Sequence, residues 1–402
     1  MASTSIKVGK RKINWIPWLI VLVILAIVVG RIIYLGTVHQ RFSSAYFIRA
    51  FLESLKLGSL YALIALGYTM VYGIIRLINF AHGEVFMVGA FFTYFLFSFS
   101  PYPLFVAALW SIFIAFGFMK IIEFWRGKLN DPVVLAFGVA AFILATYLLS
   151  QTTVNFFVAL VFSMLLTGVL GILIDKIAYA PLRTAPRNSL LITAIAVSFF
   201  WQNFGLLVFT NRQTPFRPDT FLRDKLVFSV GNGTVRTTML SIAIPLISLI
   251  LVVILTLFVT RTRLGKAMRA SAQDAEVAQM MGISVNKVIA TTFLLGSMLA
   301  AAGGAMWGLN FGSLNQPALM GILPGIKAFA AAVIGGIGSL PGAVIGALII
   351  GFMENFMTAI FPKTADFQGI TEFKDTFAFI LLIIVLLIRP SGIVGEDLSE
   401  KV

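Results

Sequence analysis

The feature that most constrains this chain of 402 residues is a series of long apolar tracts separated by short basic segments. A helix that crosses a bilayer needs about 20 mostly apolar residues, because backbone groups in the hydrocarbon core must find their hydrogen bonds inside the protein. Hydrophobic residues make up 59% of the chain and charged residues 11%, whereas soluble proteins carry about 25% charged residues. The sequence therefore predicts an all-α polytopic membrane protein.

The apolar tracts divide into about 10–12 predicted transmembrane helices, some of them short or discontinuous. The first tract follows the basic stretch Lys7–Lys12, and no small-residue cleavage site is evident after it. Residues 1–45 are therefore interpreted as an N-terminal basic segment plus an extra, retained transmembrane helix. We expect spans over residues 17–35, 51–76, 84–99, 103–122, 132–150, 153–174, 189–210, 239–259, 288–310, 322–339, 341–361 and 375–389.

The net charge of +14 comes from Lys and Arg residues that lie mostly between the apolar tracts. This placement predicts topology and contacts with anionic membrane lipid, and it does not predict nucleic acid as a partner. Counting spans puts the N-terminus, the C-terminus and residues 175–188 and 260–287 on one side, which the positive-inside rule makes cytoplasmic. The basic connection 211–238 falls on the other side and runs against this rule.

The predicted cytoplasmic loop at residues 261–287 reads RTRLGKAMRASAQDAEVAQMMGISVNK. Its segment 267–281 consists of good helix formers without Pro or Gly, and Gly282 follows as a stop signal. The apolar side chains of Val277, Met280 and Met281 fit a short amphipathic surface helix. Two interpretations remain open, a helix that lies in the lipid headgroup region and a helix on which a cytoplasmic partner docks.

The loop resembles the E-A-A-x-x-x-G loop of ABC importer permeases, with Glu276, Ala278 and Gly282 in place and Val277 where the middle alanine would be. Other stretches resemble permease subunits of the high-affinity branched-chain amino acid ABC importer family. They are YALIALGYTMVYGIIRLINFAHGEVFMVGA at 61–90, YAPLR at 179–183, the loop with its following helix at 268–308, GGIGSLPGAVIGALIIGFMEN at 335–355 and RPSGIVGE at 389–396. The resemblance covers roughly residues 46–100 and 155–397.

The resemblance implies an ABC importer permease fold over residues 46–397, with an inserted pair of helices at about 101–152 and a C-terminal tail at 398–402. It implies that the loop is a coupling element seated on a cytoplasmic ATP-binding subunit. The loop residues concerned are Arg269, Asp274, Glu276, Ala278 and Gly282. Further implied partners are a second related permease subunit, or a second copy in a homodimer, and an extracytoplasmic solute-binding protein.

The activity that the resemblance implies is import of branched-chain or other hydrophobic amino acids across a bacterial cytoplasmic (inner) membrane by alternating access. Phe80, which follows Asn79, is more typical of the amino-acid branch than of the related urea and short-chain amide permeases. Transport of urea or an amide remains the alternative. A carrier or channel that works without ATP is a further one, although it has no use for a docking helix.

Several kinds of chemistry find no support in the sequence. No G-x-x-x-x-G-K-[ST] motif occurs, so ATP has to be bound by partner subunits and no cofactor is expected on this chain. No hydrolase motif or pair of carboxylates within a span occurs, so the chain is not expected to be an enzyme and no catalytic residue is assigned. The only histidines are His39 and His82, without a carboxylate cluster, so no metal site is expected.

Two Gly/Pro-interrupted segments, one in each half, point to a pathway formed by discontinuous helices. The first contains Asn79, His82, Gly83 and Glu84, and the second contains Pro324, Gly325, Gly335 and Gly336. The span count places the first near the cytoplasmic end of the second span, where a polar turn costs little; a deeper break that lines the pathway is the alternative. Close helix packing is the alternative for Gly335 and Gly336. Lys327 is predicted either to face a cavity or partner, or to snorkel to the surface.

Overall fold

The structure is a computed structural model. It describes residues 44–98, 103–126, 132–151, 154–183, 185–209, 211–218, 220–230, 233–361 and 374–395, together with residues 26 and 30. Apart from these two single residues, the predicted span at 17–35 lies outside the described residues, as does the C-terminal tail at 398–402.

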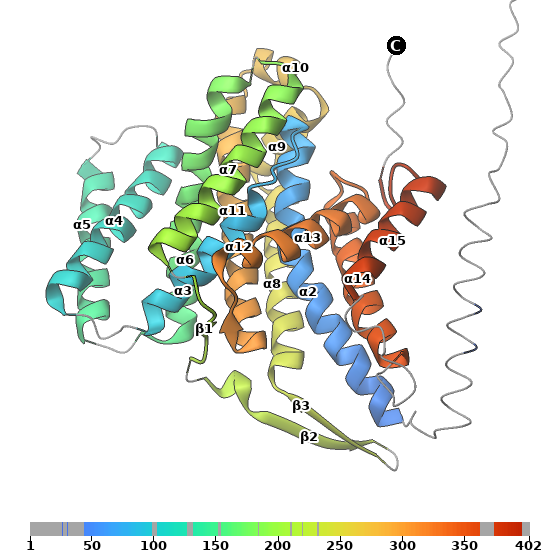
Figure 1. Cartoon of the computed structure of the whole chain (residues 1–402). Helices are drawn as coiled ribbons and strands as arrows, with labels where there is room; N and C mark the ends of the chain where they lie inside the picture. Colours follow the sequence, from blue (N-terminus) through green and yellow to red (C-terminus); the bar gives the residue numbers. More distant parts are fainter. Residues whose placement is uncertain are drawn as a thin grey trace, which may run out of the picture.

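The described part of the chain is mainly helical (Figure 1). Each predicted span from 51–76 onward coincides with a helix, and seven helices are long and apolar enough to cross a membrane. This confirms a helical, multi-pass membrane protein. The helices are α2 Ser44–Ile75, α3 His82–Ser98, α4 Leu104–Arg126, α5 Pro132–Gln151, α6 Phe156–Ile174, α7 Arg187–Val208, α8 Leu240–Arg261, α9 Arg263–Gln273, α10 Ala275–Met280, α11 Val285–Phe311, α12 Pro317–Met320, α13 Ile322–Gly335, α14 Leu340–Ile360 and α15 Lys374–Ile388.

Helices α2 and α11 form the centre of the bundle. Helix α2 packs mainly against α14 and α11, and α11 also packs against α6 and α3. Small residues permit these close approaches, as is usual where lipid offers no hydrophobic drive for helix association. A Cβ atom on Gly351 of α14 would lie 2.3 Å from the backbone N of Gly58, and one on Gly304 of α11 would lie 2.4 Å from the carbonyl O of Phe86.

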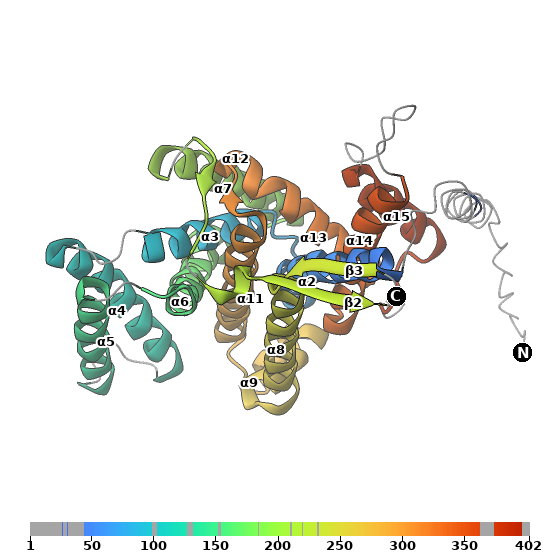
Figure 2. The ribbon, with the colours of Figure 1, turned by 90° about the horizontal axis from the view of Figure 1, so that it is seen from below.

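Helices α4 and α5 form a pair at one side of the bundle (Figures 1 and 2). They pack against each other, and α4 also contacts α6. Helix α5 exposes large apolar side chains, among them Leu135, Phe137 and Ile143, as expected of a lipid-facing helix. Helices α4 and α5, which belong to the segment expected to be an insertion, therefore lie on the outside of the core.

Two small antiparallel sheets were not predicted from the sequence. Strand β2 (Lys225–Val230) pairs with β3 (Gly233–Thr238), and β1 (Thr214–Pro215) pairs with β4 (Ser313–Leu314). The β2–β3 hairpin lies at the end of the bundle opposite to α9 and α10 (Figure 1). Its strands alternate exposed and less exposed side chains with a period of two, which is the pattern of a half-covered sheet. The described residues of the polar connection 211–238 thus include regular secondary structure.

We expect Gly351→Ala to lower the thermal midpoint of the detergent-purified protein by several degrees. The added methyl group has to push apart the backbones of α14 and α2, and overpacking typically costs about 1–3 kcal/mol. The matched control is Gly73→Ala in α2, where the nearest atom to a Cβ is 3.8 Å away. Equal midpoints for the two variants, measured by thermal unfolding, would contradict the packing described.

Candidate functional site

The loop between α8 and α11 folds as two helices where the sequence predicted one. The break falls at Asp274, whose backbone is extended (φ −154°, ψ 110°). The Asp274 carboxylate accepts hydrogen bonds of 3.0 Å from the backbone N–H groups of Glu276 and Val277. Aspartate at this position satisfies the free N–H groups at the start of a helix, so it begins α10 and does not continue α9.

Helix α10 ends at Met280, and Gly282 follows its C-cap Met281 as the stop that the sequence predicted. Gly282 has φ +85° and a Cβ there would meet nothing within 4 Å, so the residue is needed for its left-handed backbone and not for space. Ala278 is buried, whereas the apolar side chains of Met280 and Met281 are 86% and 78% exposed. The short helix therefore presents an exposed apolar tip, formed by Met280 and Met281, at one end of the molecule.

The short helix α10 is attached to the bundle through α9. The Arg269 guanidinium donates to the carbonyl of Val259, near the end of α8. Gly265 brings α9 close to the same turn, because a Cβ there would lie 2.2 Å from the Val259 carbonyl O. Arg269 therefore holds the loop in place from inside, while Asp274 and Glu276 are exposed.

The first polar break begins directly after α2 and is buried within the protein. After α2, residues 76–81 turn back into the protein, and the His82 ring lies 4.9 Å from the ring of Tyr68. A Cβ on Gly67 would overlap the His82 ring. Gly67 lies eight residues before the end of α2, which at 1.5 Å per residue is about 12 Å along the helix. Asn79, His82 and Glu84 are all at most 3% exposed.

The two predicted breaks meet in space although some 240 residues separate them in sequence. A Cβ on Gly83 would lie 2.4 Å from the Gly321 carbonyl O and 3.1 Å from the Cα of Gly325. Gly83 stands at the start of α3, and Pro324 and Gly325 stand in the first turn of α13. The junction is thus a contact between two helix starts, with glycine on both sides.

Glu84 stands beside this junction. Its carboxylate Oε1 accepts hydrogen bonds from Gln202 Nε2 at 2.9 Å and Ser198 Oγ at 3.3 Å, both on α7. A Cβ on Gly321 would overlap the Glu84 carboxylate. Glu84 thus ties α7 to the meeting point of α3 and α13.

The structure does not bring Gly335 and Gly336 to this junction. A Cβ on Gly335 would lie 1.9 Å from the Gly342 carbonyl O of α14. Gly336 has φ +104°, and a Cβ on it would lie 2.4 Å from the backbone N of Gly395. Both residues therefore serve close packing at the turn between α13 and α14, the alternative that the sequence left open for them.

A chain of polar contacts connects the first break to the start of α11. The Tyr179 hydroxyl donates to Asn79 Oδ1 at 2.7 Å. Tyr179 ends a π-helical turn, Asp175–Tyr179, and the Asp175 carboxylate accepts two hydrogen bonds from Arg183 at 2.6 and 2.7 Å. Arg183 also donates to Asn286, four residues beyond Gly282. The YAPLR turn thus stands between the loop and the break.

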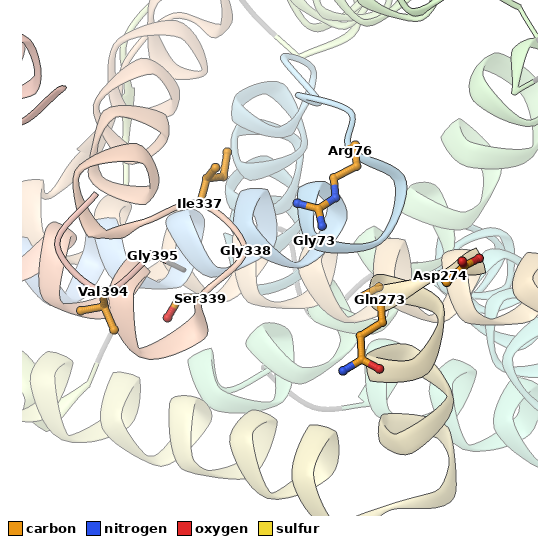
Figure 3. Close-up of a pocket in the computed structure, with 10 residues that line it drawn as sticks. Gly73, Arg76, Gln273, Asp274, Ile337, Gly338, Ser339, Val394 and Gly395 are labelled. Atoms are coloured by element: carbon orange, nitrogen blue, oxygen red, sulfur yellow. The ribbon is translucent and has the colours of Figure 1, made fainter. Parts of the chain in front are cut away.

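A cavity of about 670 Å³ lies beside the loop that joins α8 to α11. Figure 3 shows Arg76 of the segment after α2 on one side of it and Gln273 and Asp274 of the loop on another. The turn between α13 and α14, with Ile337 and Ser339, supplies a further wall. The loop, the exit from α2 and the second interrupted segment therefore border one space.

Lys327 is buried and paired, so it does not snorkel. Its Nζ lies 2.9 Å from Glu354 Oε1 on α14 and 2.5 Å from Asp375 Oδ1 on α15. These two partners were not predicted from the sequence. The sequence did contain one signal for them, the carboxylate of Glu354 inside the apolar tract 341–361, because a buried charge needs an opposite charge as partner.

A multi-pass helical bundle with discontinuous helices at its centre, and an exposed capped helix at one end, has the architecture of a transport subunit driven by a partner. The family model described as branched-chain amino acid transport system / permease component matches residues 50–134 and 132–386. The chain belongs to this family. It is a permease component of an ABC transport system, a kind of subunit without ATPase activity of its own.

Two relatives resemble the chain over nearly their whole length. The high-affinity branched-chain amino acid transport system permease protein BraD of Pseudomonas aeruginosa is 38% identical over 359 residues, which are 89% of this chain and 98% of the relative. The protein LivH of Escherichia coli (strain K12), with the same description, is 36% identical over 357 residues, again 89% and 98%. Among solved structures, PsaBC from Streptococcus pneumoniae in complex with Fab covers 90% of this chain at 12% identity, with a TM-score of 0.34 that is too low for any argument.

We expect Tyr179→Phe to lower thermal stability by about 1–3 kcal/mol, because it leaves the buried Asn79 side chain without its hydrogen bond. The shape of the residue is preserved, so the loss reports on the hydroxyl alone. Tyr147→Phe is the control, since that side chain is 61% exposed on α5. Thermal unfolding of the two purified variants checks this, and an unchanged Tyr179→Phe protein would show that the contact contributes nothing.

Proposed function

We propose that this chain is the permease subunit of an importer that carries branched-chain or other hydrophobic amino acids across a bacterial cytoplasmic membrane. The observation that carries the proposal is the match of the family model to residues 50–134 and 132–386. The two relatives named above, each described as a branched-chain amino acid permease, support the substrate class. Import of urea or a short-chain amide is the alternative.

The exposed helix α10 is proposed as the docking point of a cytoplasmic ATP-binding subunit. Large apolar side chains that project into water at a capped, rigid helix are typical of a surface that a partner covers. Val277, Met280 and Met281 are each more than half exposed. Arg269, Asp274, Glu276, Ala278 and Gly282 are proposed to shape and orient this helix, which favours docking over a helix that lies among lipid headgroups.

The side of the membrane follows from the basic residues. The connection 175–188 and the loop 261–287 lie at one end of the bundle, and we propose that this end faces the cytoplasm. The described chain reaches Gly395 at the same end, where it borders the cavity of Figure 3. We propose a cytoplasmic C-terminus on this ground, and a cytoplasmic N-terminus from the span count.

Coupling is proposed to run from the docking helix to the junction of the two helix starts. Movement of α10 reaches α11 directly, since Gly282 and Asn286 are close in sequence. The contacts of Asn286, Arg183, Asp175 and Tyr179 then lead to Asn79, at the buried break. Asn79, His82, Gly83, Glu84, Pro324 and Gly325 are proposed to line or gate the pathway by alternating access.

The hairpin end is proposed to receive a solute-binding protein. A cavity of about 440 Å³ there is lined by five cationic residues and Glu53. Such a surface attracts an acidic partner at long range. The cations are Arg49, Lys56, Arg223, Lys225 and Arg236. A second, related permease chain, or a second copy of this chain, is proposed to complete the pathway.

The substrate class is tested with vesicles that contain this chain and its candidate partner subunits. We expect uptake of labelled leucine that depends on internal ATP, and no comparable uptake of labelled urea. ATP-dependent uptake of urea alone would support the alternative substrate. Uptake of either solute that is indifferent to ATP would contradict the proposal and favour a carrier or channel.

The docking helix is tested by Met280→Glu, which places a charge on the proposed contact surface. We expect loss of the ATP-binding subunit from the purified complex and at least about a tenfold fall in uptake, equivalent to about 1.4 kcal/mol. Met280→Leu is the matched control, because it keeps an apolar side chain of similar volume at the same exposed position. A Met280→Glu chain that retains both the subunit and its transport rate would rule out docking at α10.

A further inference from the structure

A cluster of charged side chains lies inside the bundle, apart from the junction described above. Lys327 Nζ of α13 lies within 3.2 Å of Glu354 of α14, Asp375 of α15 and the Tyr61 hydroxyl of α2. The Tyr61 hydroxyl itself donates to Glu354 Oε2 at 2.9 Å. Tyr61, Lys327 and Glu354 are each at most 5% exposed. Four helices therefore converge on one buried lysine.

Lys374 balances the charges of the cluster formed by Lys327, Glu354 and Asp375. Lys374 Nζ lies 3.8 Å from Glu354 Oε1, which gives two lysines and two carboxylates in all. Lys327 is occupied by partners on several sides, whereas the side chains of Lys374 and Asp375 are 44% and 36% exposed. Lys374 and Asp375 form the rim, which thus offers one cation and one anion, side by side, to a ligand that carries both charges.

The rim opens into a cavity of about 420 Å³, a size typical of small-molecule sites. Its lining also includes apolar side chains, namely Leu323 and the rings of Trp307 and Phe311, whose centroids are 4.5 Å apart. Gln213 and Ser313, which hydrogen-bond each other at 2.7 Å, also line it. Gln213 precedes β1 and Ser313 begins β4, so this part of the lining comes from the segments that follow α7 and α11.

We propose that this cavity is a transient binding site for a free amino acid with an aliphatic side chain. The α-carboxylate is placed on Lys374 and the α-ammonium on Asp375, while the side chain lies against Trp307, Phe311 and Leu323. A zwitterion suits a site of zero net charge, and the aromatic wall suits an apolar side chain better than it suits urea. The inference rests on the proposed function and deepens it.

The position of the cavity fits a place on the transport route. Pro324 lines the cavity, and its neighbour Gly325 meets Gly83 at the junction of the two helix starts. A ligand in the cavity therefore contacts the first turn of α13, which on its other side meets the buried break. A purely structural ion cluster would need neither the apolar wall nor the partly exposed charge pair.

The first test blocks the cavity with Leu323→Trp in the complete transporter, reconstituted with its partner subunits and binding protein. We expect leucine uptake to fall by at least about tenfold while ATP hydrolysis stimulated by the loaded binding protein stays within about twofold. Leu249→Trp on α8 is the control, since both leucines are about half exposed, 47% and 58%. Unchanged uptake, or a parallel fall of uptake and ATP hydrolysis, would overturn the site.

The second test needs no transport and uses the absence of cysteine from the chain. Leu323→Cys gives a single thiol, whose modification in the purified complex is followed by mass. We expect millimolar leucine to slow modification at least about threefold, and isocaproate or isoamylamine, which each lack one charge, to have little effect. Asp375→Asn should abolish the protection. Absence of protection by leucine, or equal protection by all three compounds, overturns the site.

These two readouts separate the site from the proposed function. Failure of the parent complex to import leucine would contradict the proposed function, whereas the protection experiment would still report on the cavity. Import by the parent with no protection at Leu323→Cys would leave the proposed function standing and remove the site. Protection together with the selective loss of uptake in Leu323→Trp supports both.

Discussion

Backbone that leaves a helix inside a membrane protein has to find hydrogen bonds within the protein, because hydrocarbon offers none. Residues 76–83 face this constraint. The structure meets it locally, with the N–H groups of His82 and Glu84 bonded to the carbonyls of Asn79 and Ala81 at 3.0 and 3.1 Å. The same segment is covered by the first turn of α13, through the glycine contact of Gly83 with Gly321. An interrupted helix is tolerated here because a second interrupted helix covers it.

This contact organises the neighbouring elements. Glu84, next to Gly83, is hydrogen-bonded to α7. Tyr179 bonds the π-helical turn to Asn79 in the same break. Pro324, next to Gly325, lines the cavity with the buried charge cluster. Each connection is short and polar or involves glycine, so a shift in one element has to be matched by its neighbours. Arrangements of this kind pass between discrete packings, and do not deform continuously. The alternating access proposed for this permease needs such a property, and α10, the proposed docking helix, lies at one end of the chain of contacts.

The sequence predicted what depends on composition and local chemistry. Hydropathy placed the helices, and Gly282 marked the end of α10. The break at Asp274 was within reach, because aspartate favours the start of a helix over its interior. The burial of Asn79 and the contact between Gly83 and Gly325 could not be predicted. A span count uses only the length of each apolar tract and carries no information on contacts between distant segments. Lys327 was recognised as unusual, but its partners Glu354 and Asp375 come from other helices and carry no shared local pattern.

The proposed coupling requires that the loop 261–287 and the turn between α13 and α14 move relative to each other when partner ATP-binding subunits close. Gln273 and Ser339, on two walls of the cavity in Figure 3, report on this directly. Since the chain has no cysteine, a Gln273→Cys, Ser339→Cys double variant can carry two spin labels for a distance measurement by electron spin resonance. We expect the distance distribution to shift when ATP binds to the assembled transporter and to return after hydrolysis. One unchanged distribution in all states of a complex that still imports leucine would contradict it.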